Sequence, residues 1–269
     1  MSRFEVLCVT MHQKDFSKIE QMNIHSDVVF ANQADDTRYD EYEFKGKKAK
    51  MITTATRGVG INRNLALTYA RSEICLFGDD DVTYVDNLEE IILKEFDEHP
   101  DADIVIFNLD STDSSRKQIS YSKTRKCGKF EKMPWGCCRV ALRRSSVQKA
   151  NVWFTTLFGG GCVFPSGEDS MWLIDAKRKG LTFYVSKELI GSVSFEESSW
   201  FSGYDEKFYY GKGAFYQAVH PKTKYLWMMY FAFRTGKRTK FSFSKRIEYM
   251  KDGFTGYKNG VGFKDYKKI

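Results

Sequence analysis

The stretch that decides the fold reads EICLFGDDD at residues 73–81. Its apolar half has the length and composition of a buried strand, and its acidic half follows at the carboxyl end of that strand. Three adjacent carboxylates repel one another unless water or a cation compensates them. Carboxylate oxygens suit Mg²⁺ or Mn²⁺ together with substrate phosphates. Asp79, Asp80 and Asp81 are therefore candidates for a metal site, against the alternatives of a solvated acidic turn or a helix cap.

Strands and helices alternate on both sides of this stretch. Apolar runs predict strands at 4–10, 27–31, 49–53 and 104–108, and helical spacing predicts helices at 63–70, 86–98 and 170–180. This alternation is typical of an α/β fold with an open, mostly parallel, Rossmann-like sheet and helices on both faces. Ligands of such sheets bind beyond the carboxyl ends of the strands, where the acidic cluster lies.

Composition limits the class of protein. The 269 residues are 42% hydrophobic and 29% charged with four prolines, which excludes extensive disorder. Six cysteines without zinc-ligand spacing, and an amino terminus without a signal-sequence pattern, predict a cytoplasmic protein with reduced thiols. The net charge of +7 predicts an acidic partner, such as a nucleotide, a lipid headgroup or a nucleic acid.

Two further motifs flank the acidic cluster in the chain. Residues 57–64 read RGVGINRN, a glycine turn with two arginines that can bind a phosphate or a base edge. The third glycine of the dinucleotide fingerprint is missing. Residues 167–169 read GED before a helix, where a carboxylate can accept a proton from an attacking hydroxyl or simply cap the helix.

The tail differs from the rest of the chain. Residues 225–233 read YLWMMYFAF, which is much shorter than the roughly 20 residues needed to span a bilayer. Basic residues flank this run, which predicts a segment lying on an anionic membrane surface. We therefore divide the chain into a catalytic domain at 1–205 and a helical, membrane-associated region at 206–269, on the inner face of the plasma membrane.

Two glycine-rich segments are candidate contacts for a ligand. Gly160 lies in FGGG at 158–161, where the backbone can approach a sugar ring closely. Lys212 lies in YGKGA at 210–214 and can reach a diphosphate. An ordinary loop is the alternative for the first segment.

The order of these motifs resembles the inverting family 2 glycosyltransferases of the GT-A fold. The resemblance covers roughly residues 4–185, and the tail is similar to the basic, aromatic ends of bacterial capsule and exopolysaccharide enzymes. It implies a hexosyltransferase-like enzyme, dependent on Mn²⁺ or Mg²⁺, that uses a nucleotide-sugar donor, expected to be a UDP-sugar. The implied acceptor is a saccharide or a polyprenyl-diphosphate-linked saccharide.

Carried over residue by residue, the resemblance implies a metal site formed by Asp79 and Asp81, with Asp80 between them at the donor diphosphate. Alignment on Val82 would instead make Asp80 and Asp81 the ligands. Asp169 takes the place of the catalytic base.

The same resemblance implies the remaining roles. Glu168 is the neighbour of the base in the acceptor site, and the positions that hold the nucleotide are Thr10, Arg57 and Arg63. Many family members carry an aspartate that faces uracil after the second strand, whereas this chain reads NQAD at 32–35. Asn32 or Gln33 can still pair with a base edge through one donor and one acceptor.

Two alternatives belong to other classes. A nucleotidyltransferase of similar fold would attack the α-phosphate, but the GED motif argues against it. A non-enzymatic nucleic-acid- or membrane-binding protein would explain the charge, but the tail lacks RRM, KH or zinc-finger spacing. We expect no nucleic acid among the partners.

Overall fold

The computed structural model describes residues 2–111, 119–128, 131, 136–194 and 203–267. The chain divides into two compact units, the first formed by Met1–Thr155 and Asp169–Glu197 and the second by Thr156–Glu168 and Ser198–Ile269. The division into 1–205 and 206–269 stays a prediction. The loop at 156–168 clusters with the carboxyl-terminal helices.

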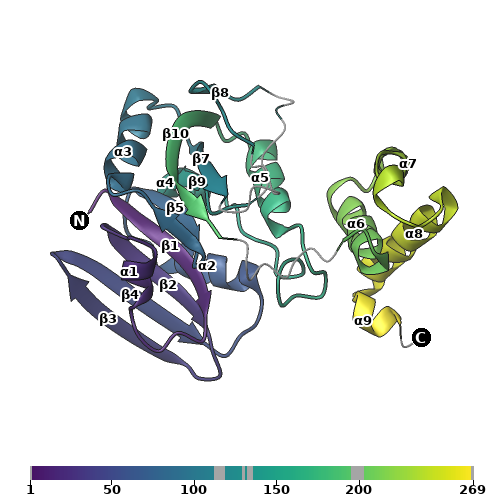
Figure 1. Ribbon diagram of the computed structural model, residues 1–269, viewed down its shortest axis with the longest axis horizontal. Coiled ribbons are helices and arrows are strands. Elements are labelled where there is room, and N and C mark those ends of the chain that lie inside the picture. The colour runs from purple at the N-terminus through teal and green to yellow at the C-terminus, as the bar shows by residue number, and fades with distance from the viewer. Residues whose placement is uncertain (1, 112–118, 129–130, 132–135, 195–202, 268–269) are drawn as a thin grey trace. The chain divides into compact units, whose positions relative to one another are not determined.

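The first unit is built on one ten-stranded sheet (Figure 1). Its main path runs in the order β3-β4-β2-β1-β5-β9-β7-β10-β6, and β8 pairs with β10. The strands are β1 (Phe4–Met11), β2 (Asp27–Gln33), β3 (Arg38–Phe44), β4 (Lys47–Thr54), β5 (Ile74–Asp79), β6 (Val82–Tyr84), β7 (Ile104–Ser111), β8 (Arg125–Lys126), β9 (Val140–Arg143) and β10 (Phe183–Val193).

The sheet is mixed, with a parallel block at its centre. Strands β4, β2, β1 and β5 are parallel neighbours, as are β7 and β10. Strand β9 lies between β5 and β7 and is antiparallel to both. Strand β4 returns antiparallel along β3 after a two-residue turn, in which Lys45 and Gly46 have φ of 47° and 77°. Positive φ at both central residues matches the twist of a tight hairpin.

Helices cover both faces of this sheet, as the sequence predicts. They are α1 (Lys18–Gln21), α2 (Val59–Tyr69), α3 (Leu88–Glu98), α4 (Arg144–Lys149) and α5 (Glu168–Arg178). Because successive strand residues point to opposite faces, Val6 and Leu7 of β1 enter two different apolar cores. Val6 shares its core with Ile92 of α3, and Leu7 shares the other with Leu67 of α2.

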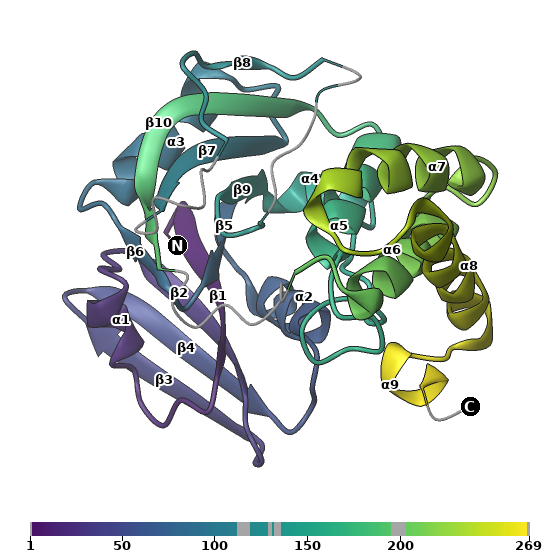
Figure 2. The same cartoon turned by 45° about the vertical axis from the view of Figure 1, so that its right-hand side comes forward.

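The second unit is helical. It contains α6 (Glu206–Val219), α7 (Lys224–Arg234), a 3-10 turn (Gly236–Arg238), α8 (Phe243–Asn259) and α9 (Phe263–Tyr266) (Figure 2). Helices α6 and α8 approach so closely that a Cβ added at Gly213 would lie 2.0 Å from the Met250 carbonyl oxygen. Phe158 and Phe164 of the 156–168 loop contact the ring of Tyr257.

Among the described residues, no helix combines the length and the apolar character needed to cross a membrane.

Candidate active site

The predicted site residues of the first unit gather at one edge of the sheet. Strands β1, β2, β4 and β5 run parallel, so their carboxyl ends meet there. Asp79 ends β5 and lies beside Val9, while Thr10 lies beside Asn32 of β2. The expectation that the acidic cluster stands at this edge is confirmed.

The acidic cluster is a turn between two strands. Asp80 and Asp81 link β5 to β6, and α3 begins only at Leu88 with Asn87 as its N-cap. The cluster therefore does not cap that helix. The Thr10 hydroxyl donates to the Asp80 carboxylate, and the Lys18 ammonium donates to the Asp80 carbonyl oxygen at 3.1 Å.

Arg63 joins this cluster to Asp169. One guanidinium nitrogen donates to the Asp79 carboxylate at 2.9 Å, and another donates to the Asp169 carboxylate. The Arg63 side chain is only 4% exposed, and its guanidinium stands 5.4 Å from the centre of the Phe154 ring. A buried cation shared by two carboxylates holds both in a defined place, because moving either one would leave charge uncompensated in a poorly hydrated setting.

Asp169 is held from a second side. Its other carboxylate oxygen accepts the backbone N–H of Cys137 at 3.1 Å. Each oxygen of an ionised carboxylate has two acceptor positions, so both oxygens can still accept a proton or a hydrogen bond from a ligand. The Cys137 contact cannot be predicted from residue types, because every residue except proline carries a backbone N–H.

The glycine turn has a packing role. Gly58 adopts φ of 127° as the N-cap of α2, and Gly60 lies inside the helix. A Cβ added at Gly60 would lie 2.2 Å from the Thr155 carbonyl oxygen. Glycine at this position thus allows α2, which carries Arg63, to pack against the chain at 154–155.

The electrostatics of the turn favour a cation. Loss of hydration, followed by the negative charges of Asp79 and Asp80, raises the pKa of the Asp81 carboxyl to about 7. Hard oxygen donors with excess negative charge fit Mg²⁺ or Mn²⁺. Among the residues that the structure describes, no group of three His, Cys, Asp or Glu side chains could hold a metal ion. A metal held by Asp79 and Asp81 would therefore need further oxygens from phosphates or water.

The residues predicted to face the nucleobase are engaged with the protein. The fully buried Asn32 amide accepts from the Gln13 N–H at 3.0 Å and donates to the Gln13 carbonyl at 2.9 Å. Gln33 accepts the Gly58 N–H at 2.7 Å. Arg57 pairs with the exposed Asp35 carboxylate. Base pairing by Asn32 or Gln33 stays a prediction. The two hydrogen bonds between the Asn32 amide and the Gln13 backbone support the loop after β1.

The other predicted residues lie in the second unit. Gly160 lies in the 156–168 segment, and Glu168 ends that segment and is the first residue of α5. A Cβ at Gly160 would meet no atom within 4 Å. The Lys212 ammonium of α6 lies 4.6 Å from the Phe215 ring centre, and burial lowers its pKa to about 8. The roles of these three residues toward a donor stay predictions.

Trp135, Trp172 and Trp200 have side chains of the kind that can stack on a sugar ring. Trp172 is 1% exposed and stacks on Phe154 with ring centres 5.4 Å apart, so it is part of the core. Trp135 and Trp200 lie outside the described residues.

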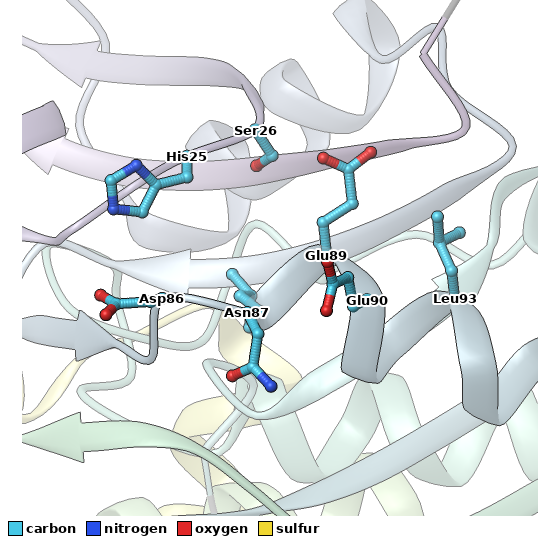
Figure 3. Close-up of a pocket in the computed structure, with 8 residues that line it drawn as sticks. His25, Ser26, Asp86, Asn87, Glu89, Glu90 and Leu93 are labelled. Carbon is cyan, nitrogen blue, oxygen red and sulfur yellow. The ribbon is translucent and has the colours of Figure 1, made fainter.

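A pocket of about 380 Å³ lies elsewhere on the first unit, beside the start of β2 and of α3 (Figure 3). Its lining is His25, Ser26, Asp86, Asn87, Leu88, Glu89, Glu90 and Leu93. None of the predicted site residues belongs to it, because they stand at the opposite ends of the parallel strands.

The first unit, a mixed sheet with an acidic turn after β5 and with helices on both faces, has the GT-A fold. Residues 28–150 match the family model for glycosyl transferase family 2. This range contains Arg63 and the acidic cluster, whereas Asp169 lies beyond it. No protein with a curated description matches the sequence.

Solved structures of S. aureus TarS are similar in fold. The structure of its residues 1-349 in complex with UDP-GlcNAc is 14% identical with a TM-score of 0.59, and the match covers 97% of this chain and 93% of that one. The same portion in complex with UDP is 13% identical with a TM-score of 0.60, at the same coverage. A longer TarS chain has a TM-score of 0.55 and 14% identity, and the match covers 98% of this chain but 44% of that one.

Proposed function

We propose that the protein is an inverting, metal-dependent glycosyltransferase that moves a sugar from a UDP-sugar to a hydroxyl of a saccharide acceptor. The observation that carries the proposal is the Arg63 bridge between Asp79 and Asp169. It brings the strand-end acid of the donor site next to the acid suited to act as a base. The family match over 28–150 and the fold shared with TarS support the same class.

Asp169 acts as the catalytic base in this proposal. Its carboxylate takes the proton from the acceptor hydroxyl while that oxygen attacks the anomeric carbon. The bond from the anomeric carbon to the diphosphate breaks on the opposite face, and the nucleoside diphosphate leaves with the electron pair. Arg63 and the Cys137 N–H keep the base in orientation. Glu168 precedes the base in the chain, and we assign it to the acceptor site.

Asp79 and Asp81 would hold Mn²⁺ or Mg²⁺ beside the donor. When bound, the metal would neutralise charge on the diphosphate leaving group. Thr10 supports this arrangement by fixing the Asp80 carboxylate. Arg57, Arg63, Gly160 and Lys212 are the further donor contacts that we propose.

The acceptor and location extend the proposal. We propose a lipid-linked acceptor such as a polyprenyl-diphosphate saccharide, with the enzyme on the inner face of the plasma membrane in capsule or exopolysaccharide synthesis. The basic, aromatic tail supports this part, since it suits the surface where such a lipid is found.

Calorimetric binding of UDP-, GDP- and dTDP-sugars, with and without Mn²⁺, tests the donor and the metal together. We expect binding of a UDP-sugar that depends on the metal and is lost in Asp81→Asn. Asp86→Asn, an exposed acid that follows β6, is the matched control and should bind normally. Absence of binding by every nucleotide sugar would overturn the proposal, and binding unaffected by both metal and Asp81→Asn would overturn its metal site.

A further inference from the structure

Helix α7 presents an apolar face to solvent. Leu226, Met229, Tyr230 and Phe233 are spaced at i, i+3, i+4 and i+7, so they share one side of the helix. Leu226 is 72% exposed and Phe233 is 81% exposed. Scattered single apolar residues are ordinary on a protein surface, whereas large apolar side chains that are exposed and adjacent on one helix face indicate an interaction site.

The side of α7 that carries Met228 and Ala232 packs against the helical unit, which fixes the direction of the exposed face. Met228 and Ala232 are buried at 3% and 0% exposure. Trp227 stacks on Tyr216 of α6 with ring centres 6.3 Å apart, and Tyr225 meets Phe254 of α8 edge-on at 5.5 Å. The apolar face is therefore held outward by the helical unit.

Positive charge surrounds this face. Between Lys207 and Ile247 the sequence contains ten Lys and Arg residues and no Asp or Glu. Exposed cations stand at both ends of the face, at Lys222 before α7 and at Arg234, Lys237, Arg238 and Lys240 at its end and after it. Arg234 also donates to the Tyr230 hydroxyl at 3.2 Å, which ties one cation to the aromatic face.

We infer that the exposed face of α7 binds an anionic lipid bilayer, with the helix lying in the plane of the interface. Leu226, Met229 and Phe233 would enter the boundary between headgroups and acyl chains. Lys237 and Lys240 would contact lipid phosphates. A helix of 11 residues that is apolar on one side and bordered by cations suits this position, and each basic residue near such a surface adds affinity.

Charge favours the bilayer over a second copy of the chain. A two-fold dimer places the same patch against itself, so the cationic borders would oppose each other without a carboxylate from 207–247 to compensate them. An anionic membrane supplies the missing negative charge. This binding requires no nucleotide sugar, so it can be tested independently of the proposed transfer reaction.

The test is co-sedimentation of the full chain with vesicles of phosphatidylcholine alone or with about one third phosphatidylglycerol. We expect binding only to the anionic vesicles, weakened when salt rises from about 0.1 M to about 0.5 M. Leu226→Ser with Phe233→Ser should weaken binding by at least about tenfold. Lys237→Gln with Lys240→Gln should weaken it by about 25-fold, at about fivefold per charge.

Matched controls separate a docking face from general charge or hydrophobicity. Lys251→Gln with Lys258→Gln removes two exposed lysines from α8, and Leu189→Ser removes an exposed apolar side chain from β10. Both should bind vesicles within about fivefold of the unaltered chain. Equal binding to neutral vesicles, or equal losses in the controls, would overturn the inference. A dimer in sedimentation velocity that Leu226→Ser with Phe233→Ser dissociates, without vesicle binding, would assign the face to a second copy instead.

Discussion

Replacement of Arg63 by methionine tests the bridge on which the site depends. The change keeps an unbranched side chain and removes the guanidinium that contacts Asp79 and Asp169. Removing one partner of a fully buried ion pair costs about 3–5 kcal/mol. The Asp79 and Asp169 side chains keep 31% and 20% exposure, so water compensates part of the lost charge. We expect a loss of about 2–3 kcal/mol, or about 4–12 °C in the melting temperature of the first unit.

A double-mutant cycle identifies the cause. If the cost arises from stranded negative charge, Arg63→Met should cost about 1–2 kcal/mol less in an Asp169→Asn background. Hydrogen exchange of amides in α2 and α5, followed against urea, measures this stability within the first unit. Arg71→Met replaces an exposed arginine just beyond α2 and should change stability by less than about 0.5 kcal/mol.

Two results would refute this reasoning. Additivity of Arg63→Met and Asp169→Asn within about 0.5 kcal/mol would mean that the two side chains do not interact. An Arg63→Met variant as stable as the unaltered chain would mean that the guanidinium does not compensate either acid.

Three further predictions concern packing, pH and the loop after β1. Gly213→Val should melt the second unit at a lower temperature, because the added Cβ meets the α8 backbone at 2.0 Å, whereas Gly128→Ala meets no atom within 4 Å and serves as the control. Lys212→Met should stabilise the second unit at pH 7 by up to about 3 kcal/mol, since burial lowers the pKa of Lys212 from 10.5 to about 8. In the unfolded chain the Lys212 ammonium keeps its proton up to about pH 10.5, whereas in the folded chain it loses the proton near pH 8. The gain in stability should therefore shrink as pH rises from 8 to 10.5. Urea titrations at several pH values would measure this change. Asn32→Ala should cost about 2–3 kcal/mol in urea unfolding by stranding the Gln13 backbone groups; an unchanged midpoint would contradict that role.

Local patterns predicted the elements at the edge of the sheet where the acidic cluster lies. The apolar runs of β1, β2 and β5 and the helical spacing of α3 are short-range signals. The alternation of apolar and polar residues that produces them can be read from neighbouring positions in the chain. The strand β3 was missed because RYDEYEF at 38–44 is an exposed edge strand, rich in charge and without an apolar stripe. Its pairing depends on the hairpin turn and on β4, and edge strands often carry charge.

These local patterns do not predict the order of the strands in the sheet. The sequence places β9 after β7, yet β9 pairs with β5 and β7 in antiparallel direction. This insertion, together with the antiparallel pairings of β3, β6 and β8, makes the sheet mixed around its parallel strands. Likewise, the 156–168 loop joins the helical unit through contacts of Phe158 and Phe164 with Tyr257, nearly a hundred positions later in the chain.

The sequence by itself determined that an acidic turn follows a buried strand, because strand, turn and carboxylates are contiguous at 73–81. It also determined that an apolar, aromatic segment stands among basic residues. Only the tertiary structure decided that Arg63 lies between Asp79 and Asp169, which is 106 positions from Arg63 in the chain. Only the tertiary structure decided, too, that one side of α7 stays exposed. The physical reason is the same in both cases: ion pairs and burial depend on which segments meet in space, and that follows from packing of the whole unit rather than from local spacing.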